Sequence, residues 1–231
     1  MVTPSGPART AGTAGEPGDA VTSDVSSPGR LTEIGGELAA EAARFASLGW
    51  MRGTSGNLSA VITRNPLQLA VTPSGLDKGS LTAADIAVVD ASGQSVAGLL
   101  EGSGSAPSAE AALHARVVGL TGARAVVHIH TVAAVVAGRR WPAGVELADL
   151  EMLKGLGLPA SGDLIRLPVI GNSQDMTELG DRFEQAVQPR IPAVLVADHG
   201  LYTWGASLLN ARHHTEIVEW LLEFMITMNN M

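Results

Sequence analysis

The sequence contains no cysteine in its 231 residues. This absence excludes disulfides, thiolate metal ligands and a cysteine nucleophile, and it is typical of proteins in the reducing cytoplasm. No stretch approaches the roughly 18 consecutive apolar residues of a membrane-spanning helix. The N-terminus also lacks the apolar core of a signal peptide. We therefore expect a cytoplasmic protein that does not bind membranes.

Aromatic side chains and positive charge are also scarce. Aromatic residues make up 3% of the chain, too few for the stacking platforms that bind single-stranded nucleic acid. With 15 Lys and Arg against 23 Asp and Glu, the formal net charge is −8. Such a molecule repels nucleic acid and anionic membranes. Any anionic substrate must therefore be held by a local pocket.

Hydrophobic residues are abundant, at 45% of the chain, and a chain of this length can bury one substantial core. We expect a single folded domain over residues 31–231. Residues 1–30 are mainly Gly, Ala, Ser, Thr and Pro, with hardly any large apolar side chains. They cannot bury enough surface to offset the entropy lost on ordering, so we predict a disordered N-terminal tail.

The folded part alternates helical and strand-like patterns. Helices are expected at 31–48 with Thr32 as N-cap, at 108–118 with Ser108 as N-cap, and at 131–137, 149–155, 176–187 and from Leu208 onward. Strands are expected at 58–63, 67–72, 86–90, 125–130, 165–170 and 193–197, and a loop at 102–107. Turn residues such as Asn65-Pro66 favour hairpins, so we predict a mixed or antiparallel sheet flanked by helices.

The strongest local signal is the pair His128 and His130. Alternate side chains of a strand share a face, so both imidazoles point one way while Val127 and Ile129 point the other. Two imidazoles at this spacing can bind one zinc ion. The alternative is a pair of polar residues on a solvated strand face. The apolar residues before the pair favour a buried strand end, where unpaired imidazoles would be costly.

A third ligand must come from elsewhere in the chain. His199 lies where an apolar strand ends against a glycine, although a single histidine in such a place is more often structural. His213 and His214 lie within a predicted helix whose polar face can hold them in water. His114 can likewise be a solvated helix residue.

Two carboxylates are candidates for acid/base chemistry. Glu110 lies in the first turn of a predicted helix, where its charge suits the helix dipole without any catalytic role. Glu151 has an equally simple interpretation as a surface residue near Lys154. The residues alone do not distinguish them.

Two loops of small residues, 53–57 and 72–79, form the third signal. Their glycines let backbone N–H groups approach a ligand, and Ser, Thr, Asn and Lys78 add donors that suit a phosphate. Ordinary turns use the same residues, but two such loops together with a probable metal pair favour phosphate binding.

Taken together, these segments resemble the class II aldolase/adducin family from about Leu31 to the end of the chain. The motifs that carry the resemblance are Gly53-Thr54-Ser55-Gly56-Asn57-Leu58-Ser59, Thr72-Pro73-Ser74-Gly75, Ser108-Ala109-Glu110, Val127-His128-Ile129-His130 and His199-Gly200-Leu201-Tyr202-Thr203-Trp204-Gly205. The ordered set is specific to the family, whereas no single motif is.

The resemblance implies an α/β fold of three layers (αβα), with helices on both sides of a largely antiparallel sheet. It also implies a homotetramer with active sites near subunit boundaries, and a small phosphorylated ketose as substrate. One Zn²⁺ per subunit would be held by His128, His130 and His199. Phosphate contacts carry over to Thr54, Gly56, Asn57, Ser74 and Gly75, with Ser108 and Lys78 as further contacts.

Within the family, Glu151-Met152-Leu153-Lys154-Gly155 resembles the methylthioribulose-1-phosphate dehydratases of methionine salvage. In that branch this glutamate is the proposed acid/base residue. In the aldolase branch Glu110 would be the base; here it is a spectator, a fourth metal ligand or a second proton carrier. A sugar-phosphate aldolase or epimerase is the alternative, and a non-catalytic adducin-like binding module is a third interpretation.

Overall fold

The computed structural model of the protein describes residues 28–96 and 106–231. Most of the predicted tail and residues 102–105 of the predicted loop lie outside this range. The first helix, α1 (Pro28–Ser47), begins three residues before the predicted start of order, and Thr32 lies inside the helix instead of capping it.

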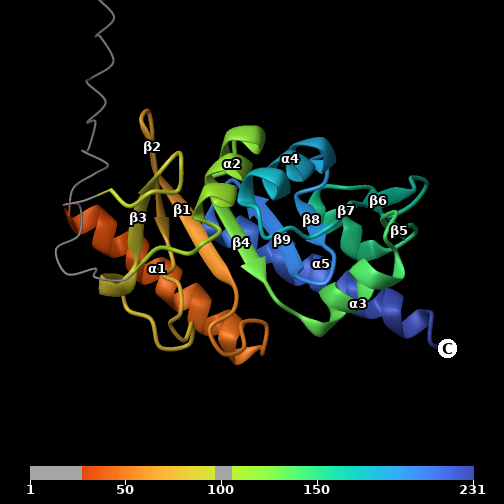
Figure 1. Ribbon diagram of the computed structural model, residues 1–231. Helices are drawn as coiled ribbons and strands as arrows, with labels where there is room; N and C mark the ends of the chain where they lie inside the picture. Colours follow the sequence, from red (N-terminus) through yellow and green to blue (C-terminus); the bar gives the residue numbers. More distant parts are fainter. Residues whose placement is uncertain (1–27, 97–105) are drawn as a thin grey trace, which may run out of the picture.

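A seven-stranded sheet forms the centre of the molecule (Figure 1), in the order β3-β2-β1-β4-β9-β8-β7. Its strands are β1 (Asn57–Arg64), β2 (Leu67–Val71), β3 (Ala87–Asp90), β4 (Ala125–Ile129), β7 (Val169–Ile170), β8 (Ala193–Val196) and β9 (Gly200–Gly205). Neighbouring strands are antiparallel except β7 and β8, which are parallel. The predicted three-layer fold with a largely antiparallel sheet is confirmed.

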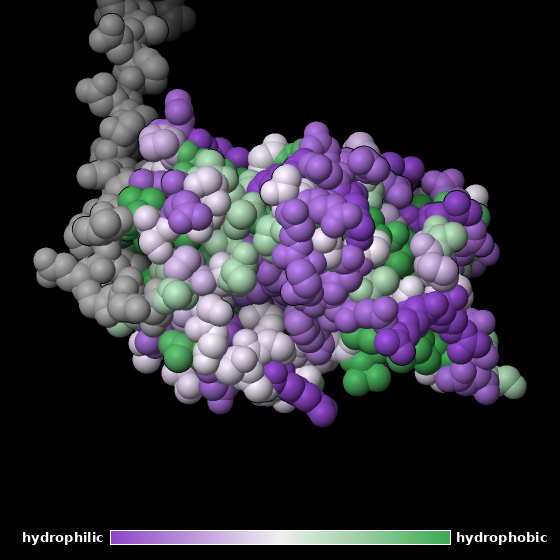
Figure 2. All heavy atoms as spheres, viewed as in Figure 1, coloured by the Kyte–Doolittle hydropathy of each residue, from purple (hydrophilic) through white to green (hydrophobic). Residues whose placement is uncertain are grey.

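Helices cover both faces of this sheet. The α2 face is covered by α2 (Ala111–Thr121) and α4 (Met176–Ala186), and the opposite α5 face by α1, α3 (Val132–Arg140) and α5 (Leu208–Met228). Each face has its own apolar cluster. Hydrophilic residues dominate the outer surface over α4 (Figure 2).

The alternation of β4 explains why both faces can be buried. Ala125, Val127 and Ile129 pack in the α5-side cluster, and Val126 packs in the α2-side cluster. Because alternate side chains point to opposite faces, His128 projects toward α2. The predicted division of this strand into an apolar face and an imidazole face is confirmed.

The remaining elements are short. They are the 3₁₀ turns η1 (Ala83–Asp85) and η2 (Glu151–Leu156) and a separate two-stranded sheet of β5 (Val145–Leu147) and β6 (Ile165–Leu167). The strand predicted at 165–170 is therefore wrong as one element, since Pro168 separates β6 from β7. Strands β5 and β9 were not predicted. Within residues 28–96 and 106–231, the helices are too short or too polar to span a bilayer.

Candidate metal site and pocket

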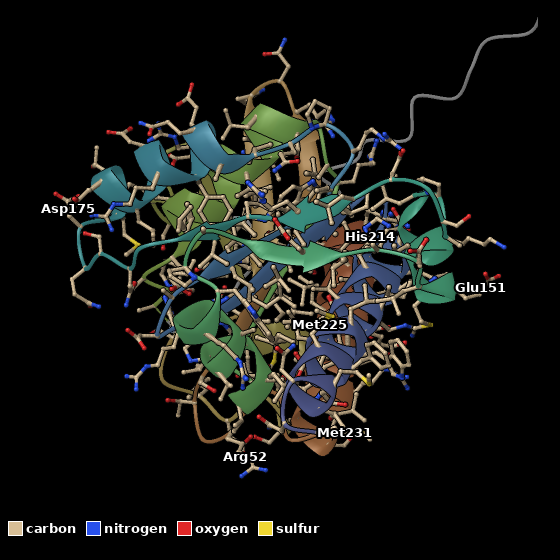
Figure 3. All side chains as sticks on the ribbon, turned by 90° about the vertical axis from the view of Figure 1, so that its right-hand side faces the viewer. Arg52, Glu151, Asp175, His214, Met225 and Met231 are labelled. Atoms are coloured by element: carbon tan, nitrogen blue, oxygen red, sulfur yellow. The ribbon has the colours of Figure 1, made fainter. Side chains whose placement is uncertain are left out.

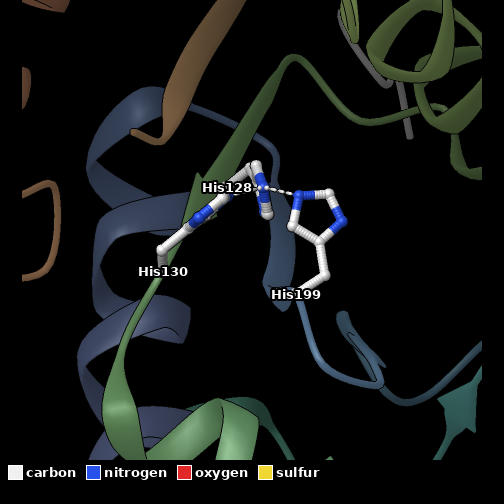
Figure 4. A group of neighbouring side chains, drawn as sticks. All are labelled: His128, His130 and His199. Atoms are coloured by element: carbon white, nitrogen blue, oxygen red, sulfur yellow. Dashed lines mark hydrogen bonds between the residues drawn. The ribbon is translucent and has the colours of Figure 1, made fainter. Parts of the chain in front are cut away.

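The three predicted metal ligands come together at one edge of the sheet (Figure 4). His128 lies in β4, His130 is the first residue after that strand, and His199 is the last residue before β9. The Nε2 atom of His128 lies 2.7 Å from that of His130 and 3.3 Å from that of His199. All three side chains point toward a common centre, and their ligand atoms lie within 4.8 Å of one another.

The backbone around His128 fixes which ring nitrogen faces this centre. Nδ1 of His128 lies 3.1 Å from the carbonyl oxygen of Leu201. A carbonyl only accepts, so Nδ1 carries the proton and Nε2 keeps its lone pair. Gly200 makes this close approach of β9 possible, because a Cβ there would lie 2.3 Å from the carbonyl oxygen of Ile129.

The cluster has the properties of a metal site. Burial lowers the pKa of His128 well below its usual range; the charge of Glu110 opposes this effect, and the imidazoles of His130 and His199 add to it. Burial likewise lowers the pKa of His130 to about 4. Neutral imidazoles are the form that binds metals, and three histidine nitrogens are the ligand set of several catalytic zinc sites. The alternative of a solvated strand face is wrong, because His128 is fully buried.

The other predicted histidines lie away from this cluster. His114 is fully buried and lies 2.8 Å from the hydroxyl of Ser59, so its interpretation as a solvated helix residue is wrong. His213 is exposed. His214 lies 2.7 Å from the carbonyl oxygen of Trp204. The structure therefore separates these three from the convergent group.

Glu110 approaches the histidine cluster from the start of α2. One carboxylate oxygen lies 3.2 Å from Nε2 of His199. The other accepts a 2.6 Å hydrogen bond from the Asn57 amide and lies 3.4 Å from Nε2 of His128. The helix begins later than predicted, with Glu110 and not Ser108 at the N-cap position, and the Glu110 side chain caps no backbone group. Its carboxylate faces the histidines instead.

The surroundings of Glu110 favour its charged form. Burial by itself opposes ionisation of this carboxyl group and is the largest single influence. The nearby imidazoles and the Asn57 amide outweigh it together and lower the pKa of Glu110. The site thus combines nitrogen ligands with a fixed negative charge.

A cavity of about 280 Å³ opens beside Glu110, His130 and His199. Most of the predicted phosphate-binding residues line it, namely Thr54, Gly56, Asn57, Ser74, Lys78 and Ser108. Gly75 is not among the lining residues; its φ of +72° permits the turn that follows Ser74. Both glycine-rich loops therefore reach the same cavity as the histidines.

Lys78 joins the two loops. Its side chain is 1% exposed, and Nζ donates to the carbonyl oxygens of Thr54 at 2.9 Å and Leu76 at 2.8 Å. Burial lowers the pKa of Lys78, and Asp77 opposes this effect. An ammonium group has three donors, and these two carbonyl oxygens accept from two of them. The cavity therefore has a buried lysine side chain at its wall.

A further wall of the cavity was not predicted. It consists of Asn172, Ser173, Gln174 and Met176, at the start of α4. The only sequence signal is a Gly-Asn-Ser turn before the helix cap Asp175, and ordinary turns have the same composition.

Glu151 does not line this cavity. Its side chain is 78% exposed and forms a 2.6 Å ion pair with Lys154. In Figure 3, Glu151 and Asp175 lie on opposite sides of the molecule. Asp175 marks the side of the cavity, because it caps α4 and the first residue of α4, Met176, lines the cavity. Within one chain, Glu110 is thus the carboxylate at the histidine cluster and Glu151 is not.

Comparisons with known proteins find relatives that match most of this chain. A family model described as Class II Aldolase and Adducin N-terminal domain matches residues 36–226. Methylthioribulose-1-phosphate dehydratase of Persephonella marina is 34% identical over 182 residues, which cover 78% of this chain and 83% of that protein. The protein of the same name from Geobacillus kaustophilus is 34% identical over 192 residues, covering 82% and 90%. The crystal structure of YgbL from Klebsiella pneumoniae superposes with a TM-score of 0.72 at 24% identity, covering 87% and 91%.

Proposed function

This chain belongs to the class II aldolase and adducin family, and we propose that it is a hydro-lyase of methionine salvage. It removes water from 5-methylthioribulose 1-phosphate and gives 5-methylthio-2,3-dioxopentyl phosphate, the activity that its dehydratase relatives carry in their names. The observation that supports this is one cavity with convergent histidines and a carboxylate beside a buried ammonium group. A metal-binding end and an anion-binding end suit a phosphorylated ketose.

Zinc, one ion per subunit, is the proposed metal. Its ligands are His128, His130 and His199, whose Nε2 atoms already face one another with His128 held in the required tautomer. Zinc favours such a set of imidazole nitrogens. When bound, it supplies a Lewis acid that polarises the carbonyl of the ketose.

The phosphate is assigned to the other end of the cavity. Lys78 supplies the positive charge, and the loops around Thr54, Gly56 and Ser74 supply hydroxyl and backbone donors. Because the chain has a net charge of −8, this local cation is what overcomes the general repulsion of an anionic substrate.

The loss of water needs two proton transfers at the substrate. A base removes the C3 proton, and an acid protonates the C4 hydroxyl as it leaves as water. The resulting enol then moves its C3 hydroxyl proton to C4 and becomes the 2,3-diketone. Glu110, which lies in the cavity, is assigned one of these transfers.

Glu151 is assigned the other transfer, in the cavity of a neighbouring subunit. Because Glu151 is exposed and does not line the cavity of its own chain, this role is possible only across a subunit boundary. We therefore propose a homotetramer in which the exposed η2 turn of one subunit completes the site of the next.

The direct test is mass spectrometry of the products after zinc-loaded protein is incubated with 5-methylthioribulose 1-phosphate. A product lighter by one water is expected. Two smaller fragments would identify an aldolase, the second candidate, which Glu110 beside the histidines favours. An isomer of unchanged mass would identify an epimerase. Unchanged substrate and no bound zinc would leave the binding-module interpretation.

Mixed oligomers test the assignment of Glu151. Glu151→Gln and His128→Ala are each expected to be inactive. Co-expressed, they should regain roughly a quarter of the wild-type activity, since random assembly pairs an intact histidine set with an intact Glu151 of the partner at that frequency. If Glu151 acts within its own chain, the mixture stays inactive. If Glu151→Gln alone is fully active and Glu110→Gln is inactive, Glu110 carries both transfers.

A further inference from the structure

A column of buried polar side chains continues from the histidine cluster into the α2 face of the sheet. Its members are Tyr202 of β9, His114 of α2 and Ser59 of β1, and each is 0% exposed. The cluster that surrounds them is otherwise apolar. The proposed reaction assigns none of them a role.

The register of the sheet places Tyr202 against a metal ligand. Asn57, His128 and Tyr202 are direct partners across β1, β4 and β9, so their side chains share one face. The ring of Tyr202 stacks on that of His128, with centroids 3.9 Å apart and planes inclined by 10°. The His114 ring meets Tyr202 edge-on at 5.9 Å. Tyr202 thus lies between a metal ligand and a second buried imidazole.

Two polar atoms of this column are buried without a partner. Among the described residues, neither the Tyr202 hydroxyl nor Nε2 of His114 has a hydrogen-bond partner, whereas Nδ1 of His114 lies 2.8 Å from Oγ of Ser59. Buried unpaired polar atoms destabilise a fold. A phenylalanine at position 202 would avoid this cost and keep the stacked ring.

The charge that acts on the Tyr202 hydroxyl comes from the site. Burial, and after it the carboxylate of Glu110, raises the pKa of Tyr202 well above its usual range. The geometry points the same way: the Tyr202 ring stacks on His128 and the Glu110 carboxylate lies 3.4 Å from Nε2 of the same residue, while the Tyr202 hydroxyl is a buried donor without a partner among the described residues. An uncompensated buried donor beside a functional carboxylate indicates a role in the site.

We propose, resting on the proposed function, that Tyr202 is a positioning residue for both His128 and Glu110. Its ring fixes the plane of the His128 imidazole by stacking. Its hydroxyl is the donor that orients the Glu110 carboxylate when this group turns from the ligand nitrogens toward the substrate. His114, anchored by Ser59, supports the Tyr202 ring from the other side.

Two substitutions separate the ring from the hydroxyl. Tyr202→Phe removes one oxygen atom and keeps the stack; we expect kcat to fall about tenfold, with KM unchanged and the unfolding midpoint unchanged or higher. Tyr202→Leu removes the stack as well; we expect zinc affinity, measured by competition with a chelator, to fall about tenfold. A merely structural tyrosine predicts the reverse for Tyr202→Phe, a lower unfolding midpoint with full kcat.

Thr203→Val is the matched control. Thr203 is the next residue of β9, points to the α5 face and has its hydroxyl 2.6 Å from that of Thr215. Loss of the Thr203 hydroxyl should lower the stability of the protein and leave zinc affinity and kcat unchanged. Chelator competition uses zinc alone, so it remains decisive for the ring even if wild-type protein dehydrates no ketose. Wild-type zinc affinity in Tyr202→Leu, or full kcat in Tyr202→Phe, overturns the corresponding half of the proposal.

Discussion

Two carboxylates on opposite faces of the sheet, Glu110 and Glu219, lie in contrasting surroundings. On the α2 face, Glu110 lies among imidazoles and the Asn57 amide, and its pKa is lowered. On the α5 face, Glu219 of α5 is 2% exposed, and burial raises its pKa to about 7 although the Thr131 hydroxyl opposes this. Burial penalises the charge of both groups. The polar groups around each carboxylate therefore decide its protonation.

This difference separates chemistry from packing within one small fold. The α2 face carries the proposed metal ligand His128 and the buried polar column, whereas the buried polar side chains of the α5 face pair with one another, Thr131 with Glu219 and Thr203 with Thr215. Thr131, the residue after His130, links the chain beside the histidine cluster to Glu219. Its hydroxyl accepts a hydrogen bond from the Ala134 N–H, which caps α3, and donates one to Glu219 at 2.8 Å.

The largest effect is expected from removing the metal ligand on the α2 face. His128→Ala should lose zinc, and activity should fall by at least about 10³-fold, because a Lewis acid contributes several kcal/mol to such reactions. Metal analysis of the purified variant and a product assay measure both losses. Removal of zinc from the wild type by a chelator should have the same effect and be reversible.

His214→Ala is the control for that loss. It removes an imidazole of α5 that bonds only Asn210 and the Trp204 backbone in the described structure. Zinc content and activity should remain near wild type. An active, metal-free His128→Ala protein would exclude the zinc site.

The next effect concerns the backbone that brings the ligands together. Gly200→Ala places a Cβ 2.3 Å from the Ile129 carbonyl oxygen and 3.0 Å from the His128 ring. The carbonyl group of Ile129 belongs to the backbone and cannot move aside as the end of a flexible side chain can. We therefore expect the free energy of unfolding to fall by about 3 kcal/mol and zinc to bind more weakly. Urea denaturation and chelator competition measure the two.

Gly119→Ala provides the comparison for this substitution. Gly119 lies inside α2, and a Cβ there meets nothing within 4 Å. It should stabilise the protein by about 0.5–1 kcal/mol, because alanine favours the helix. Equal destabilisation by both alanines would show that the close approach at Gly200 is unimportant.

Local patterns in the sequence predicted the parts of the site that depend on neighbouring residues. The alternation around His128 and His130 is a property of any strand, and the Gly-rich loops have turn chemistry that is visible directly. The approach of His199, 71 residues from His128, is different. It requires β9 to lie between β4 and β8, and the residues gave no strand order; only the family resemblance predicted it.

The two glutamates show a second limit. The position of Glu110 near the start of a helix was predicted, but its contact with the histidines depends on where α2 lies on the sheet. The resemblance to the dehydratase branch implies Glu151 as the acid/base residue, and its solvent-exposed position in one chain cannot be predicted from a local motif. Similarly, the wall at Asn172–Met176 depends on the packing of α4, which its turn composition does not specify.

The last prediction tests the carboxylate on the α5 face. Because the pKa of Glu219 is about 7 in the folded protein and near 4.5 ordinarily, the folded protein binds this proton more tightly. The stabilisation is therefore fully present below pH 4.5 and is lost as the pH rises through 7. It amounts to about 3 kcal/mol at most, for a shift of this size. Urea denaturation at pH 5 and pH 8 measures it.

Glu219→Gln isolates this contribution from that of every other titrating group. The amide keeps a partner for the Thr131 hydroxyl and carries no charge, so the variant should lose less stability than the wild type between pH 5 and pH 8. Glu223, whose charge also raises the pKa of Glu219, provides the finer test. Glu223→Gln should move the wild-type transition to lower pH without abolishing it. If Glu219→Gln retains the full pH dependence, Glu219 is ionised in the folded protein and the contrast with Glu110 disappears.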